Sequence, residues 1–217
     1  MTQHVQLTDL EFSALLSSKI CHDIIGPVGA IYNGLEVIGL DDDAAMKSSA
    51  FEVVRNVVEQ ASARLQFARF AFGAAGTAGA EVDLHTAQQI AEGLIRDSKK
   101  HRFVWSGASG MLAKNKVKLL LNLVACALTS VPRGGVIEIE VEKNEQMPKF
   151  TLTCSGRAAR PPLYLGELIE NSNGIEIDAM SIQAYYTLRL ACETDMNVSL
   201  RQDGEHIVLQ AMPSVPR

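Results

Sequence analysis

The sequence predicts an α+β protein, with an N-terminal antiparallel helical hairpin followed by an α/β sandwich. Apolar residues recur at helical spacing before residue 73, and alternating strand patterns mix with helical ones after residue 80. Between them, residues 73–80 read Gly-Ala-Ala-Gly-Thr-Ala-Gly-Ala and carry no large side chain that could pack. We therefore divide the chain into a hairpin at 1–72, a linker at 73–80 and a sandwich at 81–217.

The first helix is expected to begin at Thr8, because Thr8 and Glu11 have the spacing of a capping box. The sequence Gly-Leu-Asp-Asp-Asp at residues 39–43 is expected to end this helix and to cap the next one. One face of the first helix is apolar, with residues spaced by three or four: Phe12, Leu16, Ile20, Ile24, Val28, Ile31, Leu35 and Ile38.

The second helix carries a heptad seam, in which apolar residues alternate at spacings of three and four. A lone hairpin would leave much of this surface in water, so we expect residues 8–72 of two copies to form a dimeric four-helix bundle. The alternative is that the hairpin docks on the second half of its own chain. The seam consists of Phe51, Val54, Val58, Ala61, Leu65, Ala68 and Phe72.

The second half mixes helices with antiparallel strands, which is the pattern of an α/β sandwich. A turn at 132–135, Pro-Arg-Gly-Gly, precedes a strand with clean alternation. The expected helices cover 83 to about 99, 115–130 and 181–193, and the expected strands cover 102–106, 136–142, 149–154, 197–201 and 205–212.

Composition excludes several classes of function. A net charge of −5 without any Lys/Arg tract argues against nucleic acid as a direct ligand. No uncharged apolar run reaches the roughly 18 residues of a membrane span, and the N-terminus lacks the pattern of a secretion signal. Four scattered cysteines without a CxxC pair predict neither disulfides nor a zinc site, which favours a cytoplasmic protein with no metal site.

His22 is the candidate catalytic residue. It lies two positions from both Ile20 and Ile24, or about 200° around the helix, so it points away from the apolar face. An exposed imidazole is a neutral nucleophile near pH 7 that can carry a phosphoryl group, and the adjacent Asp23 can orient the ring or accept a proton. Pro27 interrupts the helix nearby at a cost of about 3 kcal/mol. The residues alone also fit an ordinary surface histidine beside a kink.

Residues 18–27, Ser-Lys-Ile-Cys-His-Asp-Ile-Ile-Gly-Pro, resemble the H-box of sensor histidine kinases. Residues 118–127, followed by the turn at 132–135 and a strand, resemble the N-box helix of the kinase ATP-binding domain. The resemblance covers nearly the whole chain in the right order. It implies that the second half has the fold of a histidine-kinase ATPase domain.

The same resemblance implies that the nucleotide site is degenerate. The N-box Asn that holds Mg²⁺ on ATP aligns with Cys126, and a thiol is a poor ligand for Mg²⁺. The Asp-x-Gly-x-Gly box aligns with Cys-Ser-Gly-Arg-Ala at 154–158, and residues 173–180 lack the Gly-rich lid over the phosphates. We therefore expect a domain that does not bind ATP and a chain with no cofactor of its own.

A retained His22, Asp23 and Pro27 beside a degenerate ATPase-like domain is similar to the ChpT-type histidine phosphotransferases of alphaproteobacterial phosphorelays, and residues 21–31 are close to that family. The resemblance implies a homodimer that relays a phosphoryl group through a phosphohistidine. The donor would be the receiver domain of a hybrid kinase of the CckA type. The acceptors would be response regulators of the CtrA and CpdR types, which control the cell cycle, and the receivers would supply Mg²⁺.

Neighbours of His22 on the exposed stripe are the expected partner contacts, with Lys19 facing the aspartates of the receiver. A turn near Asp41 would place residue 60 level with His22. Three residues of the second helix near this level are therefore also expected partner contacts. A non-enzymatic dimeric adaptor and a weak ATP-dependent histidine kinase remain alternative functions. The expected contacts are Ser18, Lys19, Ile25, Gly26 and Gly29 on the first helix, and Asn56, Gln60 and Arg64 on the second.

Overall fold

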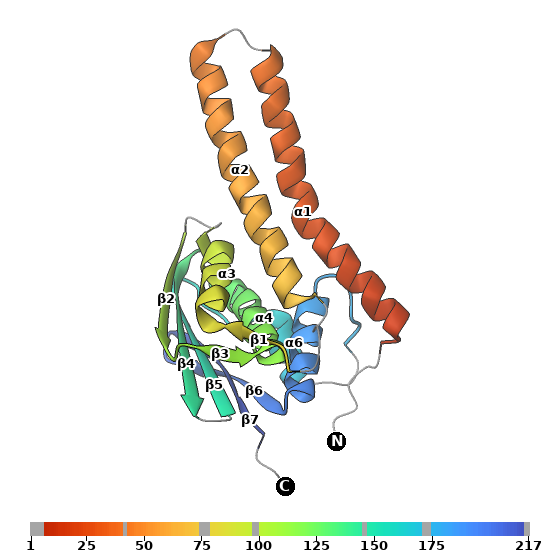
Figure 1. Cartoon of the computed structure of the whole chain (residues 1–217), viewed down its shortest axis with the longest axis vertical. Helices are drawn as coiled ribbons and strands as arrows, with labels where there is room; N and C mark the ends of the chain where they lie inside the picture. Colours follow the sequence, from red (N-terminus) through yellow and green to blue (C-terminus); the bar gives the residue numbers. More distant parts are fainter. Residues whose placement is uncertain are drawn as a thin grey trace.

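Two long helices open the chain and run side by side as an antiparallel hairpin that projects from the rest of the molecule (Figure 1). They are α1 (Asp9–Leu40) and α2 (Ala44–Ala71). The predicted α+β fold with an N-terminal hairpin is therefore confirmed. The structure, a computed structural model, describes residues 7–40, 43–73, 79–96, 100–144, 147–170 and 175–214.

Both helices begin at the predicted caps. The Glu11 carboxylate accepts a hydrogen bond from the backbone N–H of Thr8 at 2.9 Å, and Thr8 Oγ1 accepts one from the N–H of Glu11 at 3.3 Å. At α2, the Asp43 carboxylate accepts a hydrogen bond from the N–H of Ala45 at 2.8 Å. The other two aspartates of the predicted turn, at 41 and 42, lie outside the described residues.

The second half is built on a five-stranded sheet in the order β2-β4-β5-β7-β6. β2 pairs parallel with β4, and the other neighbours pair antiparallel. The helices α3 (Leu84–Arg96), α4 (Lys114–Ser130) and α6 (Ile182–Glu193) lie between the sheet and the base of the hairpin (Figure 1). The strands are β2 (His101–Gly107), β4 (Gly135–Asn144), β5 (Met147–Ser155), β6 (Met196–Asp203) and β7 (His206–Pro213).

Every helix and strand predicted for the second half is present close to its expected residues, and the predicted end of α3 near residue 99 lies outside the described residues. Three short elements were missed. β1 (Glu81–Asp83) and β3 (Met111–Ala113) pair antiparallel, and α5 (Leu163–Glu170) follows two prolines. Three residues are too few to show a period of two, and α5 has only about two turns in which to show a helical period.

The base of the hairpin and the second half share one hydrophobic core. Phe67 and Ala71 of α2 belong to the same buried cluster as the residues of α4 and of the sheet. On α1, the Phe12 ring lies 6.3 Å from that of Tyr185 and 5.6 Å from that of Tyr186, measured between centroids. Docking on the same chain, the alternative to a dimer, therefore describes the base of the hairpin.

A buried amide fixes this junction. The side chain of Asn122, on α4, is fully buried, and its amide donates hydrogen bonds to the carbonyl of Ala71 at 3.1 Å and to that of Lys118 at 2.8 Å. Its oxygen accepts a hydrogen bond from Gln183 of α6. The bond to Ala71 satisfies one of the carbonyls that the C-terminus of α2 leaves without a helical partner. Asn122 thus joins α2, α4 and α6 at one point.

The upper part of the hairpin lies away from the sheet domain (Figure 1). It exposes apolar side chains at helical spacing. On this surface, six large side chains are each between 47% and 63% exposed. In a single chain this face is in contact with water, and one helical hairpin rarely leaves so much apolar surface exposed. The six are Val28, Tyr32, Leu35, Phe51, Val58 and Leu65. Within the described ranges, no helix is both long enough and apolar enough to span a membrane.

Candidate functional site

His22 lies near the middle of α1, and its side chain is 85% exposed. Ile20 and Ile24, two positions to either side, are half-buried and face α2 and the second half. This is the orientation that their spacing predicts. The imidazole is therefore carried by a continuous helix with its ring open to solvent.

Asp23 lies beside the imidazole, but its carboxylate is bound elsewhere. Asp23 Oδ1 is 3.7 Å from His22 Nδ1, which is too long for a hydrogen bond. The other carboxylate oxygen forms an ion pair with Lys19, one turn earlier on α1. Lys19 was expected to face a partner's aspartates, whereas in the structure its half-buried side chain binds Asp23. The i, i+4 spacing of the two residues was the signal that could have revealed this pair.

Two hollows flank this part of α1. The first, which we call the outer cleft, measures about 500 Å³, and His22 lies on its wall. Its opposite walls are α4, the segment 160–165 and the start of α6. Sequence reasoning missed these walls, because only tertiary packing brings them to α1. They are contributed by Ala125, Cys126, Thr129, Arg160, Pro162, Leu163, Tyr164, Leu165, Ala179, Met180, Gln183 and Ala184.

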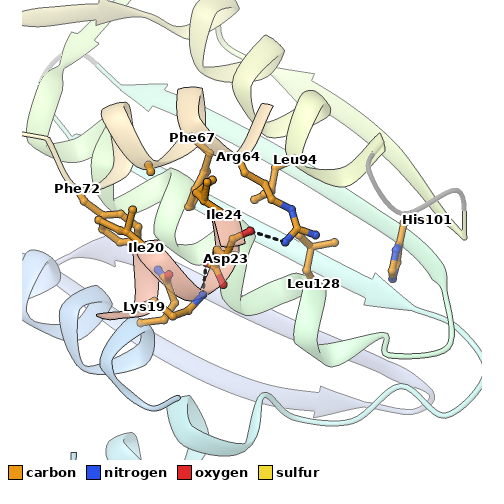
Figure 2. Close-up of a pocket in the computed structure, with 13 residues that line it drawn as sticks. Lys19, Ile20, Asp23, Ile24, Arg64, Phe67, Phe72, Leu94, His101 and Leu128 are labelled. Atoms are coloured by element: carbon orange, nitrogen blue, oxygen red, sulfur yellow. Dashed lines mark hydrogen bonds and ion pairs between the residues drawn. The ribbon is translucent and has the colours of Figure 1, made fainter. Parts of the chain in front are cut away.

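The second hollow, which we call the inner cavity, measures about 300 Å³ and lies behind α1, between the hairpin and the second half (Figure 2). Lys19 and Asp23 line both hollows. Figure 2 shows the Arg64 side chain reaching from α2 to the backbone of Asp23, where Nη1 donates a hydrogen bond to the carbonyl oxygen at 3.0 Å. The remaining labelled residues are Ile20, Ile24, Phe67, Phe72, Leu94, His101 and Leu128.

The structure spreads the other expected contacts along the hairpin. Ser18, Ile25, Gly26 and Gly29 are exposed on the same stripe of α1 as His22. On α2, Arg64 lies level with Asp23, whereas Gln60 and Asn56 lie successively closer to the tip. The sequence predicts that residue 60 lies opposite His22, which is about one helical turn too early in α2. The reason is that α2 begins only at Ala44 and not directly after residue 41.

Comparison with known proteins assigns the chain to a family. Residues 84–206 match the family model for the histidine phosphotransferase C-terminal domain. Over 215 residues the chain is 45% identical to the protein phosphotransferase ChpT of Brucella abortus (strain 2308). The aligned region covers 97% of this chain and 100% of that protein. The chain belongs to the histidine phosphotransferase family. The resemblance to ChpT-type proteins is thereby confirmed, and with it a role in phosphorelay signalling.

Two solved structures are similar to this histidine phosphotransferase. A bacterial phosphotransferase solved at 1.7 Å has 43% sequence identity and a TM-score of 0.87, covering 95% of this chain and 98% of that one. The histidine kinase domain of the blue-light activated kinase EL346 from Erythrobacter litoralis has 11% identity and a TM-score of 0.48, covering 86% of this chain and 95% of that one.

Cys126, which the kinase resemblance places at the N-box Asn, is a packing residue in this phosphotransferase. Cys126 is buried, with Sγ 3.6 Å from Thr187 Oγ1. Burial raises the pKa of the Cys126 thiol to about 11, so the thiol is neutral at pH 7. Within the described parts of the chain, no three His, Cys, Asp or Glu side chains are grouped so that they could hold a metal ion.

Gly156, which the kinase resemblance places in the Asp-x-Gly-x-Gly box, has a packing role in the structure. A Cβ on Gly156 would come within 2.5 Å of the Gly134 carbonyl oxygen, so only glycine allows these two turns to pack. Residues 173 and 174 of the expected lid lie outside the described residues. Directly after them, the Asp178 carboxylate accepts hydrogen bonds from the N–H groups of Met180 at 2.9 Å and Ser181 at 2.8 Å. The two amides just before α6 are therefore bound by a carboxylate of the chain itself.

Replacement of Cys126 by Ser should make the stability of the protein less sensitive to alkaline pH. Between pH 9 and about pH 11, an unfolded thiol ionises while the buried one stays protonated, so rising pH favours the unfolded state. Two pKa units correspond to about 2–3 kcal/mol of unfolding free energy lost across this range. Urea unfolding of both proteins at several pH values measures the slope. Equal slopes for the two proteins would show that the Cys126 thiol already ionises normally in the folded state.

Proposed function

We propose that this phosphotransferase relays a phosphoryl group between receiver domains through a phosphohistidine on His22. The observation that carries the proposal is an imidazole that is 85% exposed on a rigid helix, on the wall of the outer cleft. A receiver domain presents an aspartyl phosphate, which is a reactive acyl phosphate. An exposed neutral imidazole is the type of nucleophile that accepts such a group at neutral pH.

The proposed transfer starts with the lone pair of His22 Nε2, the ring nitrogen farther from Asp23. Nε2 attacks phosphorus in line, the bond from phosphorus to the aspartyl oxygen breaks, and its electron pair leaves with the receiver's carboxylate. Asp23 Oδ1, 3.7 Å from Nδ1, stabilises the positive charge that develops on the ring, or accepts the Nδ1 proton once the carboxylate turns toward the ring. A receiver that holds Mg²⁺ would supply the positive charge that neutralises the phosphoryl oxygens. The reverse sequence of steps phosphorylates a second receiver and returns His22 to its starting state.

The proposed partners are the receiver of a hybrid kinase of the CckA type and response regulators of the CtrA and CpdR types, in a cytoplasmic cell-cycle phosphorelay. The 45% identity to a ChpT protein supports this assignment. A receiver that brings its acidic pocket to His22 would contact the exposed stripe formed by Ser18, Ile25, Gly26 and Gly29. The outer cleft beside this stripe leaves room for the loops of the receiver.

We further propose that the second half does not bind ATP. The Cys126 thiol stands where the kinase resemblance calls for a hard oxygen ligand, and the Asp178 carboxylate already binds backbone amides just before α6, which are then not free to bind a phosphate. Adding Mg-ATP at millimolar concentration should therefore leave the unfolding temperature unchanged. A rise of several degrees would contradict this and would favour a weak histidine kinase.

Replacement of His22 by Ala should abolish phosphoryl acceptance while leaving receiver binding intact, because the nucleophile is lost and the docking surface is kept. The measurement is transfer of radiolabel from a phosphorylated receiver, with the label stable in alkali and labile in acid. The matched control, His206→Ala, changes an exposed histidine on β7 and should retain full acceptance. If the His22→Ala protein still takes label, the mechanism is wrong. If that variant also supports full signalling in cells, the adaptor function replaces the enzymatic one.

Arginine at Gly26 or Gly29 should block docking and so lose transfer while His22 is still present. A Cβ at either position would meet no atom within 4 Å, so the change adds bulk to the surface without disturbing the fold. Gly39→Arg is the matched control, since Gly39 is equally unobstructed near the far end of α1. Receiver affinity and label transfer should both fall for the first two variants and stay unchanged for the third. Equal transfer by all three would remove this stripe from the docking surface.

The exposed apolar face of the hairpin is the proposed homodimer interface. A charge at Leu65 or Val58, each about half exposed in one chain, would be buried without a partner in a four-helix bundle. Leu65→Glu or Val58→Asp should therefore cost several kcal/mol of dimer stability. Light scattering should give twice the mass of one chain for the unmodified protein and for the control Met111→Glu, which changes an exposed residue of β3. A monomer at micromolar concentration would contradict the dimer.

A further inference from the structure

Pro27 removes a hydrogen bond from α1 next to the phosphoacceptor. Proline has no N–H, so the carbonyl four residues earlier loses its usual donor, and that carbonyl belongs to Asp23. Arg64 of α2 supplies a replacement, since its Nη1 donates to the Asp23 carbonyl oxygen at 3.0 Å (Figure 2). A guanidinium from the second helix thus completes the hydrogen bonding of the first helix one residue after His22.

The bond lies in partly buried surroundings. Arg64 is half-buried and lines the inner cavity, together with the apolar side chains of Ile24, Phe67 and Leu128. The carboxylate of Asp23 is bound separately by Lys19. Asp23 is therefore held by Arg64 through its backbone and by Lys19 through its side chain, and this fixes the turn of helix that carries His22.

We infer that Arg64 is a positioning residue for phosphoryl transfer. It acts by taking the carbonyl that Pro27 leaves unpaired, and it does not act by contacting the incoming receiver. The inference rests on the proposed role of His22. In-line transfer requires close alignment of Nε2 with phosphorus, so a looser helix turn should slow transfer within the bound complex more than it weakens binding.

A double-mutant cycle between residues 64 and 27 tests this inference, because Pro27→Ala restores the N–H that the Asp23 carbonyl lacks. Arg64→Met should lower the rate of phosphoryl uptake at saturating receiver roughly tenfold, with little change in the receiver concentration at half-maximal rate. In the Pro27→Ala background the same change should cost less than about twofold. Arg64→Lys, which keeps one donor, should retain part of the rate. Arg55→Met changes an exposed arginine of the same helix and is the matched control.

If Arg64→Met raises the half-maximal receiver concentration equally with and without Pro27→Ala, Arg64 is a receiver contact and the inference is overturned. The four proteins of the cycle are the unmodified chain, Arg64→Met, Pro27→Ala and the double variant. Their thermal unfolding should show the same coupling, and this readout does not involve His22. If the phosphohistidine mechanism is wrong, the two substitutions should still show coupled effects on unfolding. If their effects on unfolding are independent, the inference about Arg64 is refuted, while the phosphohistidine mechanism is unaffected. If Arg64→Met fails to fold on its own but folds when combined with Pro27→Ala, that rescue supports the inference. Arg64→Lys then completes the kinetic cycle.

Discussion

The junction between the base of the hairpin and the second half is the constraint on which the rest of this structure depends. Phe67 and Ala71 place the end of α2 in the core of the sheet domain, and Asn122 ties the last turn of that helix to α4 and α6. The outer cleft exists only because this junction holds α4 and the start of α6 opposite His22. The same junction leaves the upper hairpin clear of the second half and open to a second copy and to partners.

The proposed loss of ATP binding has a local counterpart in the packing of the second half. Cys126 packs against Thr187, Gly156 allows two turns to meet, and the Asp178 carboxylate binds the amides near the start of α6. Each of these residues lies where the kinase resemblance would place a nucleotide contact, and each has a contact within the chain. The second half thereby provides walls for the outer cleft, and in the proposed mechanism the chemistry is left to His22 and to the incoming receiver.

The features that the sequence predicts are those set by local chemistry. The caps at Thr8 and Asp43, the long helices and the exposure of His22 follow from side-chain spacing along a helix, and all agree with the structure. Features that depend on the geometry of a turn or on distant packing were missed. The level of Arg64 opposite Asp23 depends on where α2 begins, and the walls of the outer cleft come from segments far apart in the chain. Very short elements such as β1 carry too few residues to show a period.

The central claim is that His22 carries the phosphoryl group through Nε2, the ring nitrogen turned away from Asp23. Phosphorus NMR of the full-length protein, phosphorylated by a receiver and trapped in alkali, tests this most directly, with mass spectrometry of its peptides to locate the modified residue. The account predicts a single phosphoramidate signal with the shift of Nε2-phosphohistidine, on the peptide that contains His22. A phosphoryl group on Nδ1, on another residue, or on no residue of this chain would contradict it.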